Sequence, residues 1–253
     1  APIILNMLAH APGERKTRLG RPVEVATGGA APPSSVIVAM EKMGFEVTHL
    51  YGLTECFGPT TYCAPKEAWA HMDPEDKARE MARQGVRYPT LSDQMVLDPE
   101  TMAPVPADGV TIGELMLQGN TVMKGYLKNP EATKEAFTSD GWYRTGDLGK
   151  MDEEGYVFIT GRLKELIIKG GENIAPREID DVLYRHDGVL EAAAFPLPDV
   201  DYGQTVAAAI AVRPGEEVPE SVLRQLCLDA MGAYRSPSLY FFLDELPKGP
   251  SGK

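Results

Sequence analysis

The chain has 253 residues, of which 43% are apolar and 25% are charged. This composition is typical of a soluble globular protein with a substantial core, built as one large domain or two ordinary ones. The formal net charge of −12 argues against a general nucleic-acid or anionic-membrane binder, because both need a basic face. An anionic ligand would need only a few local cations.

No apolar run approaches the roughly 18 residues of a membrane span, and no secretory leader is recognised. The three cysteines, Cys56, Cys63 and Cys227, match no zinc or redox spacing. We therefore expect buried thiols in a reducing, cytoplasmic compartment. The chain starts at Ala1 and stops at Lys253, and we expect both ends to be cut.

The first 50 residues carry a strand–helix–strand pattern. Residues 23–26 predict a short strand, residues 34–43 carry apolar side chains at helical spacing behind a serine cap, and residues 45–50 predict the next strand. This order is typical of a βαβ unit in a parallel sheet, where ligands bind at the C-terminal ends of the strands. We expect a turn at Gly28 and a loop at 51–55 to lie on that edge.

The rest of the chain changes character twice. Residues 65–88 are polar and predict an exposed, mostly helical excursion, whereas short β-prone runs up to residue 159 predict a small β-barrel or sheet. Two helices, the first opened by Pro176, and three strands then predict a compact α+β unit. The expected fold class is thus α/β plus α+β. We expect a large domain at 1–163, made of an α/β part at about 1–90 and a β-rich part at about 91–160, and a small domain at 164–253.

Two loop stretches carry side chains suited to a nucleotide. In residues 51–55 the Tyr51 ring could stack on a base, the Thr54 hydroxyl could bind a phosphate oxygen and Glu55 could hold Mg²⁺. An ordinary strand-to-loop turn explains this stretch equally well. Asp147 follows a glycine and could accept both hydroxyls of a ribose, or it could simply cap a turn.

Two further stretches are rich in glycine and lysine. Residues 161–174 lie between the two expected units, which is typical of a hinge or of a solvated linker. Residues 246–253 form a Pro/Gly loop that presents lysines, or a disordered basic end.

The four stretches and Thr27–Pro33 resemble the motifs of the adenylate-forming superfamily of acyl-CoA synthetases, luciferases and peptide-synthetase adenylation domains. They occur along this chain in the same order as in that family. Ala82–Tyr88 and Val122–Pro130 are similar to short- or medium-chain fatty acyl-CoA ligases of bacteria and plants. The resemblance covers essentially the whole chain. It implies a partial adenylate-forming fold and an ATP-dependent acid–CoA ligase of fatty acid metabolism, which uses ATP, Mg²⁺ and coenzyme A.

The resemblance also implies roles for individual positions. Lys253, Thr54 and Glu55 would be catalytic, with Glu55 as the metal ligand. Lys164 would be the hinge of the small domain. The implied nucleotide-binding positions are Gly28, Gly29, Ala30, Tyr51, Gly52, Asp147 and Arg162. The implied CoA path contains Gly170 and Gly171, and the acyl pocket contains Ala31, Cys56, Phe57 and Gly58, for which core packing is the alternative.

The sequence departs from the family pattern at both ends. No glycine- and serine/threonine-rich phosphate loop with its lysine occurs in the chain, so we expect the first half of the large domain to lie upstream and this chain alone to be inactive. The short tail that usually follows Lys253 is missing, and Gly249 stands where a threonine is commoner. Three alternatives stay open: a ligase for a dicarboxylic or aromatic acid, a carrier-protein acyl ligase, or a non-catalytic fragment that binds adenine nucleotide or a partner. The oligomeric state also stays open.

Overall fold

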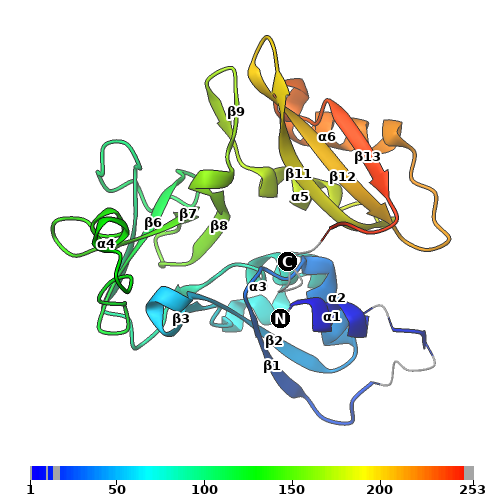
Figure 1. The fold of residues 1–253 in the computed structure, drawn as a ribbon. Helices are drawn as coiled ribbons and strands as arrows, with labels where there is room; N and C mark the ends of the chain where they lie inside the picture. Colours follow the sequence, from blue (N-terminus) through cyan, green and yellow to red (C-terminus); the bar gives the residue numbers. More distant parts are fainter. Residues whose placement is uncertain (1, 10, 14–17, 248–253) are drawn as a thin grey trace. The chain divides into compact units, whose positions relative to one another are not determined.

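The structure is a computed structural model that describes residues 2–9, 11–13 and 18–247. The chain divides into two compact units, residues 1–159 and 160–253 (Figure 1). Each unit has its own hydrophobic core.

A mixed four-stranded sheet in the order β1-β2-β3-β4 begins the N-terminal unit. β1 and β2 are parallel, which confirms the predicted βαβ unit. β3 and β4 pair antiparallel, so the expectation of a parallel sheet is wrong for this half. In chain order the elements are α1 (Pro2–Ala9), β1 (Val23–Gly28), α2 (Ser34–Lys42), β2 (Phe45–Leu53), the 3-10 turn η2 (Thr54–Cys56), β3 (Gly58–Tyr62), η3 (Glu67–His71), α3 (Pro74–Met81) and β4 (Val86–Arg87).

The helices of this unit pack together on the sheet. Ile37 and Met40 of α2 are fully buried and share one core cluster with Val47 of β2. Trp69 and Ala78 belong to the same cluster, so the expectation that residues 65–88 are an exposed excursion is wrong. The segment is polar on one side only, because Ala78 and Met81 lie three residues apart on the inner face of α3.

A second four-stranded sheet, in the order β5-β6-β7-β8, forms the β-rich part. The sequence predicted a small barrel or a sheet here, and over the described residues it is an open sheet. Leu115 and Leu117 of β6 are fully buried in its core beside Val157. Its elements are β5 (Asp93–Leu97), β6 (Gly113–Gln118), α4 (Pro130–Glu135), β7 (Tyr143–Met151) and β8 (Val157–Arg162).

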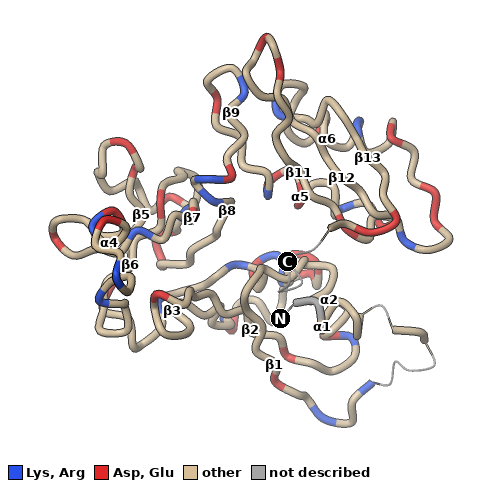
Figure 2. Tube along the Cα trace, in the orientation of Figure 1, with Lys and Arg blue, Asp and Glu red and all other residues tan. Residues whose placement is uncertain are grey.

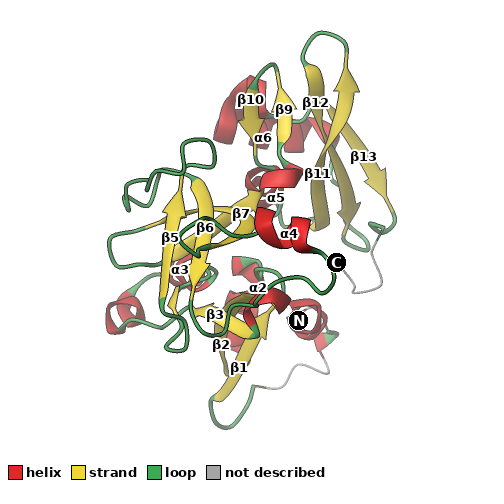
Figure 3. Ribbon diagram, turned by 60° about the vertical axis from the view of Figure 1, so that its left-hand side comes forward, coloured by secondary structure: helices red, strands yellow, loops and turns green. Residues whose placement is uncertain are grey.

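The C-terminal unit is a five-stranded sheet with two helices (Figure 3). Both helices and three of the strands were predicted, whereas the short strands at 167–169 and 172–174 were not. Leu183 of α5 and Leu223 of α6 pack against Val206 and Ile210 of β12 in one cluster, so both helices lie on the same face of the sheet. The strand order is β10-β9-β12-β11, with β13 parallel to β12. The elements are η4 (Leu163–Glu165), β9 (Ile167–Lys169), β10 (Glu172–Ile174), α5 (Pro176–Leu183), β11 (Val189–Asp199), β12 (Gly203–Val212), α6 (Glu220–Arg235) and β13 (Leu239–Leu243).

Acidic and basic residues are spread along both units (Figure 2). Within the described ranges, no helix is both long enough and apolar enough to span a bilayer.

Candidate active site

Tyr51 lies near the C-terminal end of β2, which continues through Leu53 and so extends beyond the strand predicted from the sequence. β2 is longer because β3 pairs with it, and a bulge between Tyr51 and Gly52 interrupts the register. A side chain at Gly52 would collide with the carbonyl of Gly58, so this close approach requires glycine. The chain then turns through η2, and Phe57 adopts a left-handed φ of 54°.

Tyr51 and Asp147 are brought together from different sheets. The Tyr51 hydroxyl donates a 2.6 Å hydrogen bond to Oδ2 of Asp147, which is 4% exposed. Burial, reinforced by the Asp147 carboxylate, raises the pKa of Tyr51 well above its usual value. The phenol therefore keeps its proton and remains a donor to Asp147.

The side chain of Thr145 fixes the turn that carries Asp147. Thr145 Oγ1 accepts a 3.0 Å hydrogen bond from the backbone N–H of Asp147 and donates to the carbonyl of Leu115 at 2.7 Å. Gly146 has a φ of 71°, a conformation that favours glycine. The motif thus places Asp147 beside Tyr51 with a fixed backbone.

Glu114 supports the same turn and was missed by the sequence analysis. It is 1% exposed, and its Oε2 accepts hydrogen bonds from Nη2 and Nε of Arg144 at 2.8 and 3.1 Å. Its Oε1 accepts from the N–H of Gly146 at 3.1 Å. A glutamate inside the apolar run 113–117 is a signal that could have predicted this role, because a buried carboxylate needs hydrogen-bond or charged partners.

Glu55 is held by the loop that follows β6. The Tyr126 hydroxyl donates to Glu55 Oε1 at 3.0 Å, and the N–H of Met123 donates to the Glu55 carbonyl at 2.6 Å. Partial burial and then the Glu55 carboxylate raise the pKa of Tyr126, so this phenol also stays protonated. Tyr126 was not predicted as a site residue, although it lies in a stretch that carried the family resemblance.

The structure brings the Gly28 turn to the same edge as Tyr51. Gly28 is paired with Leu50, the residue before Tyr51. A Cβ on Gly28 would stand 2.8 Å from the Leu50 carbonyl oxygen, so this pairing favours glycine. Gly29 follows with a φ of 94° and is exposed, as is Ala30.

The four positions expected in the acyl pocket differ in burial. Cys56 is 1% exposed and packs in the cluster of Leu115 and Leu117; burial raises the pKa of its thiol to about 12. Phe57 is 90% exposed, Gly58 is exposed and Ala31 is half-buried. All three cysteines are buried free thiols, as expected.

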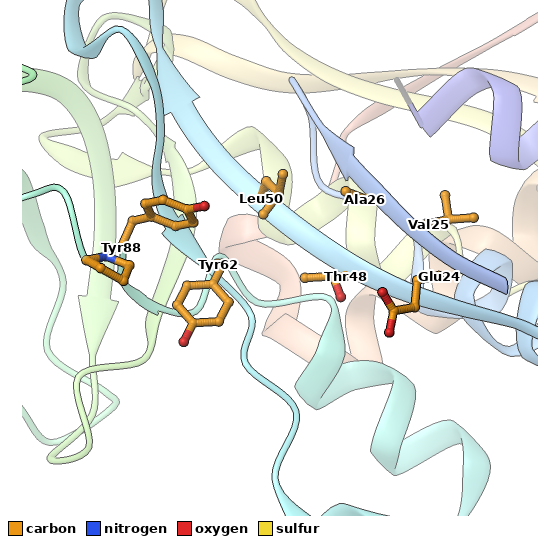
Figure 4. Close-up of a pocket in the computed structure, with 8 residues that line it drawn as sticks. Glu24, Val25, Ala26, Thr48, Leu50, Tyr62 and Tyr88 are labelled. Atoms are coloured by element: carbon orange, nitrogen blue, oxygen red, sulfur yellow. The ribbon is translucent and has the colours of Figure 1, made fainter. Parts of the chain in front are cut away.

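A hollow lies on the face of the first sheet opposite Val47 and the helices (Figure 4). The rings of Tyr62 and Tyr88 meet edge to face there, with centroids 5.6 Å apart. The lining residues are Glu24, Val25, Ala26, Thr48, Leu50, Tyr62, Tyr88 and Pro89. Within this described lining there is no predicted site residue.

Other predicted site residues belong to the C-terminal unit. Arg162 ends β8, Lys164 lies in η4, and both are exposed. Gly170 and Gly171 join β9 to β10. Lys253 lies outside the described residues.

Two segments of the chain match known families. Residues 1–127 match the family described as AMP-binding enzyme, and residues 178–253 match the AMP-binding enzyme C-terminal domain. The first match covers half of the 253 residues. The chain belongs to the AMP-binding enzyme family.

Curated relatives of this AMP-binding enzyme are named as CoA ligases. An acetate–CoA ligase of Humulus lupulus is 45% identical, with 100% of this chain and 45% of that protein covered. A 2-methylpropanoate–CoA ligase of the same plant is 42% identical, with 100% and 46% covered. A peroxisomal acetate/butyrate–CoA ligase of Arabidopsis thaliana is 44% identical, with 100% and 45% covered. The chain thus spans just under half of each relative.

Solved structures of similar proteins share this fold. ATP-bound MatB from Rhodopseudomonas palustris is 32% identical with a TM-score of 0.83, and 99% of this chain and 47% of that chain are covered. The amide bond synthetase McbA from Marinactinospora thermotolerans is 30% identical with a TM-score of 0.85, and 99% of this chain and 49% of that chain are covered.

The described residues contain no ready-made cage for a magnesium ion. Over the described residues, no group of three or more His, Cys, Asp and Glu side chains is arranged to hold a metal ion. Mg²⁺ is commonly bound through one or two carboxylates together with substrate phosphates. Glu55, with Oε1 oriented by Tyr126, fits that mode of binding.

Proposed function

We propose that the full-length protein is an ATP-dependent acid–CoA ligase. In the first step a carboxylate oxygen attacks the α-phosphorus of ATP and pyrophosphate leaves. In the second step the thiol of CoA loses its proton, its sulfur attacks the acyl carbon and AMP leaves. The observation that carries this proposal is the hydrogen bond that unites Tyr51 with Asp147, beside Glu55 and its partner Tyr126.

The nucleotide would lie along the C-terminal end of β2. The Tyr51 ring stacks on adenine while its hydroxyl orients Asp147, and Asp147 accepts the two ribose hydroxyls. Gly28, Gly29, Ala30 and Gly52 let the backbone approach the nucleotide closely.

Charge at the α-phosphate must be neutralised before a carboxylate can attack it. Thr54 would donate to an α-phosphate oxygen, and Glu55 would hold Mg²⁺. When bound, Mg²⁺ offsets negative charge and orients the phosphates. Lys253 reaches the carboxylate and the α-phosphate for the same purpose, and Arg162 lies near the ribose.

The C-terminal unit would serve both steps in turn. We assign the large domain to residues 1–163 and the small domain to 164–253, with Lys164 as the hinge. Rotation exchanges Lys253 for the turn at Gly170 and Gly171, which lines the path of the pantetheine arm.

The substrate we propose is a short-chain fatty acid. The support is the set of relatives named for acetate, 2-methylpropanoate and butyrate. Ala31, Cys56, Phe57 and Gly58 would form part of the acyl pocket wall. We propose the cytoplasm as the compartment, although two relatives of Arabidopsis thaliana are named as peroxisomal; fluorescence microscopy of the tagged full-length protein tests this point.

The experiment is a product analysis of the full-length protein with ATP, Mg²⁺, CoA and a panel of acids from two to ten carbons. We expect AMP and an acyl-CoA, with acetate to butyrate preferred. A dicarboxylic or aromatic acid as the best substrate would overturn the proposed acid class. A product formed with an amine or a carrier protein but not with CoA would overturn the proposed acceptor.

A further inference from the structure

A short hairpin in the C-terminal unit carries Gly170 and Gly171 at its tip. β9 and β10 are paired over three residues each, and the two glycines have φ values of 54° and 87°. Positive φ at both central positions is typical of a tight two-residue hairpin turn. A hairpin this short is marginally stable by itself, so contacts with the rest of the unit must fix the tip.

Lys169 and Tyr234 supply such contacts through a reciprocal pair of hydrogen bonds. Lys169 Nζ donates to the carbonyl of Tyr234 at 2.7 Å, and the Tyr234 hydroxyl donates to the carbonyl of Lys169 at 2.6 Å. The N–H of Gly170 also donates to the carbonyl of Tyr202 at 2.8 Å. The turn is thereby tied to α6, which carries Tyr234, and to the connection between β11 and β12, which carries Tyr202.

Lys169 is unusually buried for a lysine, at 8% exposed. Its ammonium lies 4.8 Å from the ring centroid of Tyr234 and 5.7 Å from that of Tyr202, within the range of cation–π attraction. The two rings meet edge to face.

The glycine turn fits tightly against this cluster. A Cβ on Gly170 would stand 2.5 Å from the Tyr234 hydroxyl oxygen and 3.0 Å from the Tyr202 ring. At Gly171 no atom lies within 4 Å of that position over the described residues. One glycine thus packs inward on the tyrosines, whereas the other leaves its backbone open to a ligand.

We propose that Lys169 and Tyr234 are positioning residues that hold the glycine turn in the shape required by the pantetheine arm of CoA. The inference rests on the proposed function, in which this turn lines the CoA path. The pantetheine arm is narrow and bears amides, so an open glycine backbone can approach it and exchange hydrogen bonds with it. A displacement of the turn by about 1 Å would weaken those contacts and misplace the thiol.

The test is Tyr234→Phe in the full-length protein, with Tyr202→Phe as the matched control that keeps the neighbouring ring. Thioester formation from supplied acyl-AMP and carboxylate-dependent ATP–pyrophosphate exchange are measured separately. For Tyr234→Phe we expect kcat/KM for CoA to fall about tenfold, mainly through KM, because one hydrogen bond to the turn is lost. Exchange should stay within about twofold of wild type, because the variant leaves adenylation untouched.

A structural readout accompanies the kinetics. Amide hydrogen exchange over residues 167–174 should become faster in Tyr234→Phe and stay unchanged in Tyr202→Phe. Lys169→Met, which keeps the apolar stem but loses the ammonium, should repeat both effects of Tyr234→Phe.

An unchanged CoA step in folded Tyr234→Phe would overturn this inference, as would equal losses in the two half-reactions or an equal effect of Tyr202→Phe. These outcomes leave the proposed function intact, because wild type still performs both steps. A wild-type protein that performs neither step would contradict the proposed function itself, and the inference with it.

Discussion

The hydroxyl of Tyr51 has a role that its ring cannot replace, because it donates to a nearly buried carboxylate. Tyr51→Phe keeps the ring for the proposed stacking on adenine, but Asp147 loses a donor. We expect KM for ATP to rise about tenfold, since a hydrogen bond to a charged acceptor is worth about 1.5 kcal/mol. Steady-state kinetics of the full-length protein measures this. Tyr62→Phe on the next strand is the control, and equal effects of the two variants would contradict the role assigned to the hydroxyl.

Glu114 offers a second test at the residue scale. Glu114→Gln keeps the volume of the side chain but removes the charge that faces Arg144, and it weakens the bond to Gly146. Because Arg144 is partly exposed, we expect a loss of about 2 kcal/mol in the free energy of unfolding, below the range for fully buried pairs. Urea unfolding measures this loss. Exposed Glu153→Gln should change stability by less than about 0.5 kcal/mol; a similar loss in both variants would show that the pairing with Arg144 is unimportant.

At the scale of elements, η4 is the segment that the hinge proposal places under rotation. Proline at Lys164 would fix φ near −65° and remove an N–H, whereas alanine would leave the backbone free. We expect Lys164→Pro to spare adenylation and suppress thioester formation, and Lys164→Ala to retain both. Parallel losses in the two half-reactions of folded Lys164→Pro would argue for a passive linker.

The elements themselves could be predicted where the pattern is local. Apolar spacing and turn residues predict β1, α2 and the first part of β2. They also predict α5, which begins at Pro176. The antiparallel return of β3 could not be predicted, because Gly58 and Pro59 are typical of a turn and the left-handed Phe57 that precedes the strand has no sequence signature.

The candidate site depends on contacts at long range, which local patterns do not encode. Nothing near Tyr51 in the sequence indicates that Asp147 accepts its hydrogen bond. The family resemblance alone assigned both residues to one nucleotide. Glu114 and Tyr126 escaped prediction because each lies in a stretch that is equally compatible with an ordinary strand or loop.

At the scale of the whole molecule, the proposed reaction depends on more than the 253 residues of this chain. The chain covers just under half of its curated relatives, so activity is expected of the full-length protein. In the proposed mechanism Thr54 contacts the α-phosphate and Glu55 binds Mg²⁺, and the upstream phosphate loop that the family resemblance implies would hold the other phosphates.

Carboxylate-dependent ATP–pyrophosphate exchange by the full-length protein tests the central claim most directly, because it reports the first chemical step without CoA. We predict exchange with at least one short-chain acid, dependent on Mg²⁺, and AMP as the nucleotide released when CoA is added. Release of ADP and phosphate, or no exchange with any acid of a broad panel, would contradict the account.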